Sequence, residues 1–281
     1  LQIFVEDSAV TEIMINGKDQ IFVEKEGSIK KLDIGFESEE KLQDVIQQIV
    51  AGCNRVVNEA SPIVDARLAN GARVNVVMKP IALNGPIVTI RRFPEKPITM
   101  KELLLKKSIN SEAAAFLEKL VVAKYNIFIS GGTGSGKTTL LNVLSGFIPK
   151  EENAELQLQG LENLVRLETR AFSEEGCREI SVRDLIKTSL RMRPDRIIVG
   201  EVRGEEAVDM SQALNTGHEG SMSTGHANSA ADMLSRLENM VLMGIDMPLK
   251  AIRQQLASGI DIIVHLGRLR DRSRRVLEIT E

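Results

Sequence analysis

The chain has 281 residues, of which 43% are hydrophobic and 27% are charged, and its formal net charge is −3 at pH 7. This length accommodates two domains with a sizeable core, and the composition is ordinary for a globular protein. The slightly acidic balance gives no overall basic field for nucleic acid, and no apolar run approaches the ~20 residues of a membrane-spanning helix. Cys53 and Cys177 lack metal-ligand spacing, which is typical of a reduced cytosolic protein. The sequence starts at Leu1 rather than methionine, so we expect residues before it in the full protein.

Residues 1–92 are predicted to form a small α+β domain of PAS-like type, because short apolar runs alternate with turn signals. Strands are expected at 12–15, 20–24, 64–68, 73–77 and 87–92. Asn70-Gly71 is a typical hairpin turn between two of them. A helix is expected from the capping residue Ser38 to about Cys53, where apolar residues recur with helical spacing. Residues 93–99 contain two prolines and are interpreted as a linker.

Residues 100–281 are predicted to form an α/β domain, because helical and strand patterns alternate along this part of the chain. Helices are expected after the capping residues Ser111 and Ser181 and near 230–243 and 249–258. Strands are expected at 126–130, 196–199 and 261–265. This order indicates a central, mainly parallel sheet with helices on both faces.

Residues 131–139 match the P-loop pattern G-x-x-x-x-G-K-[ST], between an apolar strand and an amphipathic helix. Its glycines let backbone N–H groups surround phosphate oxygens, and the helix N-terminus adds the positive end of its dipole. Lys137 can reach the β- and γ-phosphates, and the Thr138 hydroxyl can ligate Mg²⁺. An incidental lysine in a flexible turn would not explain both flanks. The predicted nucleoside triphosphate site comprises Gly131, Gly132, Thr133, Gly134, Ser135, Gly136, Lys137, Thr138 and Thr139.

The expected strand at 196–199 is followed by Gly200 and Glu201. A carboxylate at the end of a buried strand is the Walker B arrangement, where it orients Mg²⁺ or the attacking water. Gly200 stands where an aspartate is usual, so Glu201 must carry the acidic role alone. The alternative is a surface glutamate that happens to follow a core strand.

Residues 216–228 form a polar, glycine-rich segment that contains His218 and His226. A histidine near the γ-phosphate can donate a hydrogen bond and report hydrolysis to the rest of the domain. A metal site here would need further ligands, and the sequence offers no candidate. The third histidine, His265, ends an apolar strand and is interpreted as a satisfied core histidine.

The P-loop, the stretch 192–204 and the two Thr-Gly-His boxes together resemble the type II/type IV secretion ATPase family, with similarity over nearly the whole chain. The resemblance is greatest to the CpaF-type ATPases of Tad (Flp) pilus assembly. It implies a RecA-like domain, ATP as the nucleotide, and a homohexameric ring with ATP between the two domains. It matches Glu201 to the Walker B glutamate and His226 and His218 to the His box. In this family, arginines neutralise the charge of the phosphates. The candidates for this role here are Arg91, Arg92, Arg166, Arg170 and Arg203. Each of them could equally form a surface salt bridge.

One departure concerns the acidic Asp box of the family, which ends an apolar strand after the P-loop helix. Here Glu155 matches its final glutamate, but residues 150–156 contain no strand-forming apolar run. We expect this strand beside the P-loop strand, where its loss would leave unpaired backbone groups, so about seven residues are inferred to be absent near Glu152–Asn153. The candidate catalytic residues are therefore Lys137, Glu155, Glu201 and His226.

The family resemblance implies an ATPase that powers pilus assembly or protein secretion together with an inner-membrane platform protein. Its expected place is the cytoplasmic face of the inner membrane, where it associates with the membrane only through partners. A nucleic-acid translocase is the alternative, since RecA-like rings also move DNA, but the net charge weighs against it. A kinase or GTPase would leave the N-terminal domain and the His box unexplained.

Overall fold

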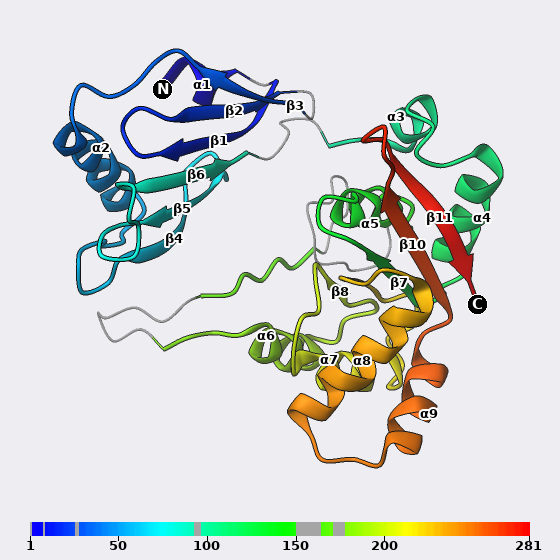
Figure 1. The fold of residues 1–281 in the computed structure, drawn as a ribbon. Coiled ribbons are helices and arrows are strands. Elements are labelled where there is room, and N and C mark those ends of the chain that lie inside the picture. The colour runs from blue at the N-terminus through cyan, green and yellow to red at the C-terminus, as the bar shows by residue number, and fades with distance from the viewer. Residues whose placement is uncertain (1, 8, 26–27, 93–96, 150–163, 171–177) are drawn as a thin grey trace. The chain divides into compact units, whose positions relative to one another are not determined.

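The computed structural model describes residues 2–7, 9–25, 28–92, 97–149, 164–170 and 178–281 (Figure 1). The chain divides into two compact units, Leu1–Lys96 and Pro97–Glu281. The linker expected at 93–99 spans this division. Among the described residues, no helix combines the length and the apolar character that a membrane crossing requires.

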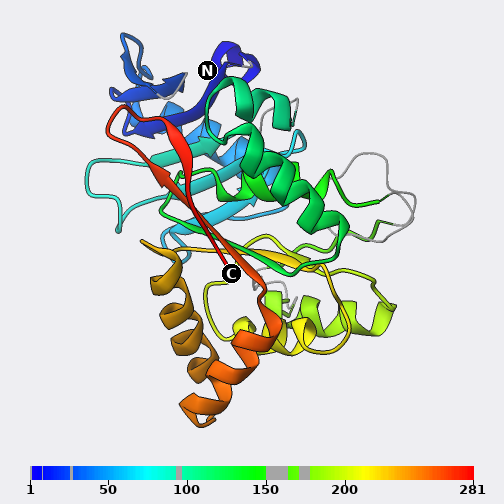
Figure 2. The same ribbon diagram turned by 90° about the vertical axis from the view of Figure 1, so that its right-hand side faces the viewer.

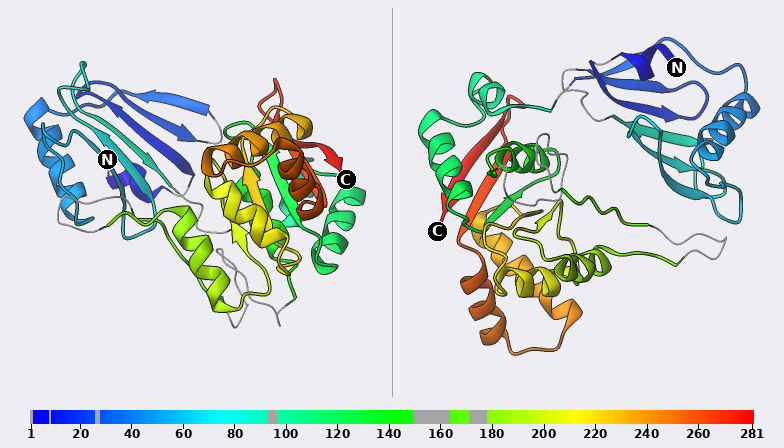
Figure 3. Two further views of the ribbon diagram at one scale, coloured as in Figure 1. Left: turned by 90° about the horizontal axis from the view of Figure 1, so that it is seen from below. Right: turned by 180° about the vertical axis from the view of Figure 1, so that it is seen from behind.

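The first unit is a six-stranded antiparallel sheet in the order β3-β2-β1-β6-β5-β4, with two helices (Figures 1 and 3). Helix α2 begins after Ser38, whose side chain accepts a hydrogen bond from the Lys41 amide, as the sequence predicts. Its buried residues Leu42, Ile46 and Val50 pack into the same core as the sheet. The elements are α1 Gln2–Glu6, β1 Val10–Asn16, β2 Ile21–Lys25, β3 Ser28–Leu32, α2 Glu39–Ala51, β4 Ile63–Arg67, β5 Arg73–Val77 and β6 Ile87–Arg91.

The second unit is built on a five-stranded sheet in the order β11-β10-β7-β9-β8. Strands β10, β7, β9 and β8 are parallel, and only β11 is antiparallel to its neighbour. The sheet therefore confirms the expected mainly parallel α/β architecture. Its strands are β7 Ile127–Gly131, β8 Ile198–Val199, β9 Met222–Gly225, β10 Ile262–Arg268 and β11 Arg274–Thr280. The helices are α3 Met100–Leu105, α4 Ser111–Val122, α5 Lys137–Ser145, α6 Val182–Ser189, α7 Glu206–Leu214, α8 Ala230–Gly244 and α9 Leu249–Gly259, with a 3₁₀ turn at Leu190–Met192.

Two cores cover the two faces of this sheet, because successive strand residues point to opposite sides. In β7, Ile127 and Ile129 pack with α4 and α5, whereas Phe128 packs with α6 to α9. Figure 2 shows α4 and α5 on one side of the sheet and α7 to α9 on the other. This division fixes the P-loop helix α5 on the α4 side of the strand that precedes it.

Strand β9 lies beside the P-loop strand, although its sequence Met-Ser-Thr-Gly carries little apolar character. Ser223 and Thr224 are buried, and their hydroxyls donate to the carbonyls of Val199 (3.1 Å) and Gly200 (2.7 Å). Because these polar groups are satisfied, they can occupy the sheet interior. This strand was not among those expected from the sequence, where residues 216–228 stand out only as a polar, glycine-rich segment.

The expectation of a missing strand beside the P-loop strand is wrong in its premise. β7 pairs with β10 along one edge and with β9 along the other, so no row of backbone groups is left open there. The suspected gap itself, near Glu152–Asn153, lies outside the described residues, as does Glu155.

Other differences from the expected elements are local. Helices α1, α3 and α7 and strands β3 and β11 carry weak sequence patterns and were not expected. Asn110 rather than Ser111 caps α4, through a 2.7 Å bond from the Ala113 amide to its side-chain oxygen. The expected helix after Ser181 starts with a capping box between Ser181 and Asp184 and ends at Ser189, earlier than the Arg193 expected from the sequence.

Candidate functional site

The P-loop joins β7 to α5 through glycines in conformations that side chains disfavour. Gly131, Gly134 and Gly136 have φ values of 154°, 70° and 99°. Gly136 is the N-cap of α5, and no side chain caps the helix there. The first amides of α5 are therefore left for an anion, as a phosphate site requires.

The P-loop packs tightly against β10 at Gly131 and faces open space at Gly132 and Gly134. A Cβ at Gly131 would lie 2.4 Å from the Leu266 carbonyl oxygen and 2.6 Å from Ser135 Oγ, so only glycine fits against β10. A Cβ at Gly132 or Gly134 would meet nothing within 4 Å. Ser135 Oγ is buried without a hydrogen-bond partner among the described residues. This cradle fits the phosphate groups of a nucleotide.

Lys137 is buried at the start of α5, with 6% of its surface exposed. Its ammonium group donates to the carbonyls of Gly131 and Gly132, both at 3.0 Å, and lies 3.3 Å from His226 Nδ1. These contacts match the three protons that an ammonium carries. Burial lowers the pKa of Lys137, while the nearby Glu201 carboxylate acts in the opposite direction.

Glu201 follows β8 at the carboxyl end of the sheet, and β9 holds this segment in place. The Thr224 hydroxyl bonds the Gly200 carbonyl, and the Thr224 carbonyl accepts from the Val202 amide at 2.8 Å. Arg203 donates to Glu201 Oε2 at 2.6 Å. Glu201 Oε1 is buried and has no aligned hydrogen bond, although His226 Nε2 lies 2.7 Å away. Oε2 faces Arg203 and Oε1 faces His226, so the carboxylate is held between these two side chains.

His226 follows β9 and stands between Lys137 and Glu201. Because Nδ1 faces the Lys137 ammonium, the ring proton belongs on Nε2, which faces the carboxylate. Burial, followed by the charge of Lys137, lowers the pKa of His226. The imidazole is therefore neutral near pH 7, and the expected meeting of Lys137, Glu201 and His226 is observed.

The residues expected at a metal are Thr138, in the first turn of α5, and Glu201. The described part of the chain holds no cluster of three or more His, Cys, Asp or Glu side chains that could bind a metal ion. Mg²⁺ takes one or two protein oxygens and completes its shell with water and phosphate oxygens. The Thr138 hydroxyl and the Glu201 carboxylate supply oxygen atoms of this kind.

His218 lies at the other end of β9. It precedes the strand, and its Nδ1 contacts the Ala213 carbonyl oxygen at 3.1 Å. Parallel pairing sets Gly225 beside Ser130 and Met222 beside Ile127, so the start of β9 lies away from the P-loop. His218 therefore lies away from the P-loop of its own chain, and its role at a nucleotide stays a prediction. His265 is buried and lies 2.8 Å from the Ser130 hydroxyl, as expected of a satisfied core histidine.

Of the three candidate arginines in the second unit, Arg203 is the one that the structure places beside Glu201. Arg91 and Arg92 belong to the first unit, where Arg92 donates to the Asp7 and Val10 carbonyls. Arg170 donates to the Arg178 carbonyl at 3.1 Å, beside its bridge to Ile180. Arg166 is exposed in the neighbouring stretch. Their roles at the nucleotide stay predictions.

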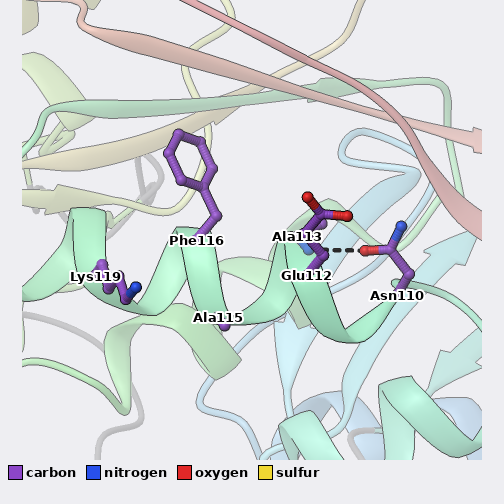
Figure 4. Close-up of a pocket in the computed structure, with 6 residues that line it drawn as sticks. All are labelled: Asn110, Glu112, Ala113, Ala115, Phe116 and Lys119. Atoms are coloured by element: carbon purple, nitrogen blue, oxygen red, sulfur yellow. Dashed lines mark hydrogen bonds between the residues drawn. The ribbon is translucent and has the colours of Figure 1, made fainter.

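A separate pocket lies on α4 rather than at the P-loop. It has a volume of about 490 Å³ and is lined by Phe116 together with Asn110, Glu112, Ala113, Ala115 and Lys119 (Figure 4). The residues that line this pocket include none of the P-loop, Glu201 or His226.

The glycine-rich loop joins the parallel strand β7 to helix α5, and its buried lysine lies near the carboxylate that follows β8. These features define a P-loop nucleotide-binding domain. The family model described as "Type II/IV secretion system protein" matches residues 1–278. The chain belongs to this family.

Relatives and solved structures agree with that assignment. A protein of Mycobacterium tuberculosis named for conjugal transfer is 33% identical over 282 residues, covering 96% of this chain and 80% of that protein. The VirB11 ATPase of the Brucella suis type IV secretion system, solved with sulphate, is 25% identical with a TM-score of 0.53, covering 99% and 94%. The pilus retraction motor PilT with bound ADP shares the fold at 18% identity and a TM-score of 0.63, covering 94% and 76%. These structures confirm the expected fold class.

Proposed function

We propose that the protein is an ATP-hydrolysing motor subunit that powers protein secretion or pilus assembly. The observation that carries this proposal is the buried Lys137–His226–Glu201 arrangement against an open glycine cradle. Membership of the secretion family supports ATP as the nucleotide. A CpaF-type place within the family is part of the proposal and rests on the sequence motifs alone.

The proposed roles of Lys137, Glu201 and His226 follow from where each side chain lies relative to the P-loop. When ATP enters, Lys137 exchanges its bonds to the Gly131 and Gly132 carbonyls for phosphate oxygens. Glu201, which follows β8 beside the P-loop, acts as the base that orients the attacking water. His226 links the two and senses loss of the γ-phosphate through the Lys137 contact.

The Thr138 hydroxyl and the Glu201 carboxylate would hold Mg²⁺, and the ion would supply positive charge to the β- and γ-phosphates. Glu155 remains a candidate for the acidic box, proposed on its sequence match only.

The active assembly is proposed to be a homohexamer, the closed ring that the family resemblance implies. Arg91, Arg92, Arg166 and Arg170 are the proposed candidates for arginines that act on the nucleotide of a neighbouring subunit, as the family resemblance implies. Arg203 already bonds Glu201 and acts within its own subunit. The ring is proposed to work on an inner-membrane platform protein at the cytoplasmic face, with no direct membrane insertion.

A nucleic-acid translocase is the second candidate, favoured by the relative named for conjugal transfer. The formal net charge of −3 opposes it. Stimulation of ATPase activity by DNA, falling steeply with salt, would favour this candidate over the secretion motor.

The motor proposal is tested by measuring ATPase activity across a size-exclusion profile with Mg²⁺ present. We expect turnover to follow a species of roughly six chain masses and to vanish with a chelator. Nucleotide binding without turnover in every fraction would reject the motor. Turnover confined to the monomer would reject the hexamer.

A further inference from the structure

Two arginines face each other across the β10–β11 hairpin. Arg268 and Arg274 are direct partners in the antiparallel ladder. Like charges in this arrangement repel and destabilise a strand pair. Both side chains are exposed, and no acidic ion-pair partner is found for either in the part of the chain that the structure describes. An anion held between them would remove the repulsion.

These arginines lie on the P-loop face of the sheet. Leu266, two residues before Arg268, packs into the α4–α5 core, and so does Val276, two residues after Arg274. Side chains two apart along a strand share a face, so both arginines point to the α5 side. A Cβ at Gly136 would lie 3.7 Å from Arg274 Cδ. The stem of Arg274 therefore lies next to the N-cap of the P-loop helix, and Figure 1 shows the hairpin beside α5.

The order of the strands indicates which end of a bound nucleotide the β10–β11 hairpin would face. β10 and β11 flank β7 on one edge, while β9 and β8, which lead to His226 and Glu201, flank it on the other. Under the proposed function, His226 and Glu201 mark the γ-phosphate end of the nucleotide. The hairpin then faces the opposite, nucleoside end, and the amides at the start of α5 cradle the phosphates between them.

We propose, as an extension of the proposed function, that Arg274 and its partner Arg268 bind the α-phosphate of the nucleotide held in the P-loop of the same subunit. The guanidinium groups provide charge-assisted hydrogen bonds to an anion beside a helix N-cap that no side chain occupies. ADP and ATP share the α-phosphate, so this contact should increase the binding affinity of both nucleotides by the same factor. Hydrolysis of the γ-phosphate does not use it.

The test compares three single substitutions in the full chain by calorimetric titration with Mg-ADP and with a non-hydrolysable ATP analogue. Arg274→Ala should weaken both nucleotides about tenfold and by the same factor, and Arg274→Lys should recover part of the loss. Arg270→Ala, which removes the same charge from the exposed turn of the same hairpin, is the matched control and should leave affinity unchanged. Turnover at saturating ATP should stay near wild type in the Arg270→Ala control.

The other possible outcomes separate a failure of the Arg274 contact from a failure of the proposed function. Unchanged ADP affinity in Arg274→Ala, or an equal loss in Arg270→Ala, would overturn the contact and leave the proposed function standing. A loss confined to the ATP analogue would place Arg274 at the γ-phosphate and overturn the assignment. If wild type bound neither nucleotide, the proposed function would fail and this inference with it. Thermal unfolding of each variant shows that the effect is not loss of the fold.

Discussion

The ammonium of Lys137 lies 3.3 Å from Nδ1 of His226, which joins the P-loop helix to the strand beside it. On the other side of the ring, Nε2 lies 2.7 Å from Glu201. A phosphate that draws Lys137 away from the histidine changes the surroundings of the carboxylate in the same step. This relationship couples nucleotide occupancy to the proposed base.

Replacing Lys137 by alanine should reduce ATPase activity by a factor of about a hundred or more, because the phosphates lose their fixed cation. Steady-state phosphate release measures this. Lys101→Ala, which removes an exposed lysine on α3 of the same unit, is the control and should behave as wild type. Near wild-type activity in Lys137→Ala would contradict the motor proposal.

Glu201→Gln should retain nucleotide but barely turn it over, because the amide keeps the shape of the side chain and loses the charge that orients water. Nucleotide titration and phosphate release, measured on the same preparation, separate the two effects. Glu219→Gln alters an exposed glutamate before β9, away from the P-loop, and should change neither. Intact turnover in the nucleotide-bound fraction of Glu201→Gln would remove the proposed role.

Mixed assemblies test whether the subunits act together. Lys137→Ala chains co-assembled with wild type should depress activity more than in proportion to their share, because each inactive site interrupts a coupled ring. Mixtures with Lys101→Ala should instead keep full activity at every ratio. A strictly proportional decline with Lys137→Ala would mean that the subunits hydrolyse ATP independently.

Gly131→Ala should destabilise the second unit by about 1–3 kcal/mol or more, since its φ is 154° and the added Cβ would lie 2.4 Å from the Leu266 carbonyl oxygen. Thermal and denaturant unfolding measure the change. Gly132→Ala is the matched control, because its Cβ would meet open space. Equal unfolding midpoints for the two variants would show that β10 does not press against the loop as described.

The sequence by itself determined the features that rest on local patterns. The P-loop glycines, Lys137 and the strand–loop–helix context are contiguous, so their motif indicates a phosphate site without any tertiary information. The family, the mainly parallel sheet and the capped helix α2 also follow from short-range patterns. These expectations agree with the structure and with the family match.

Only the tertiary structure decided which residues meet. Ser223 and Thr224 belong to a polar, glycine-rich segment, yet they form a buried strand because their hydroxyls reach carbonyls at the end of β8. That strand separates His218 from His226, although both stand in similar Thr-Gly-His boxes. Arg274 reaches Gly136 only because β11 folds back on β10. Each of these outcomes depends on hydrogen bonds and packing between segments far apart in the chain, which no local periodicity records.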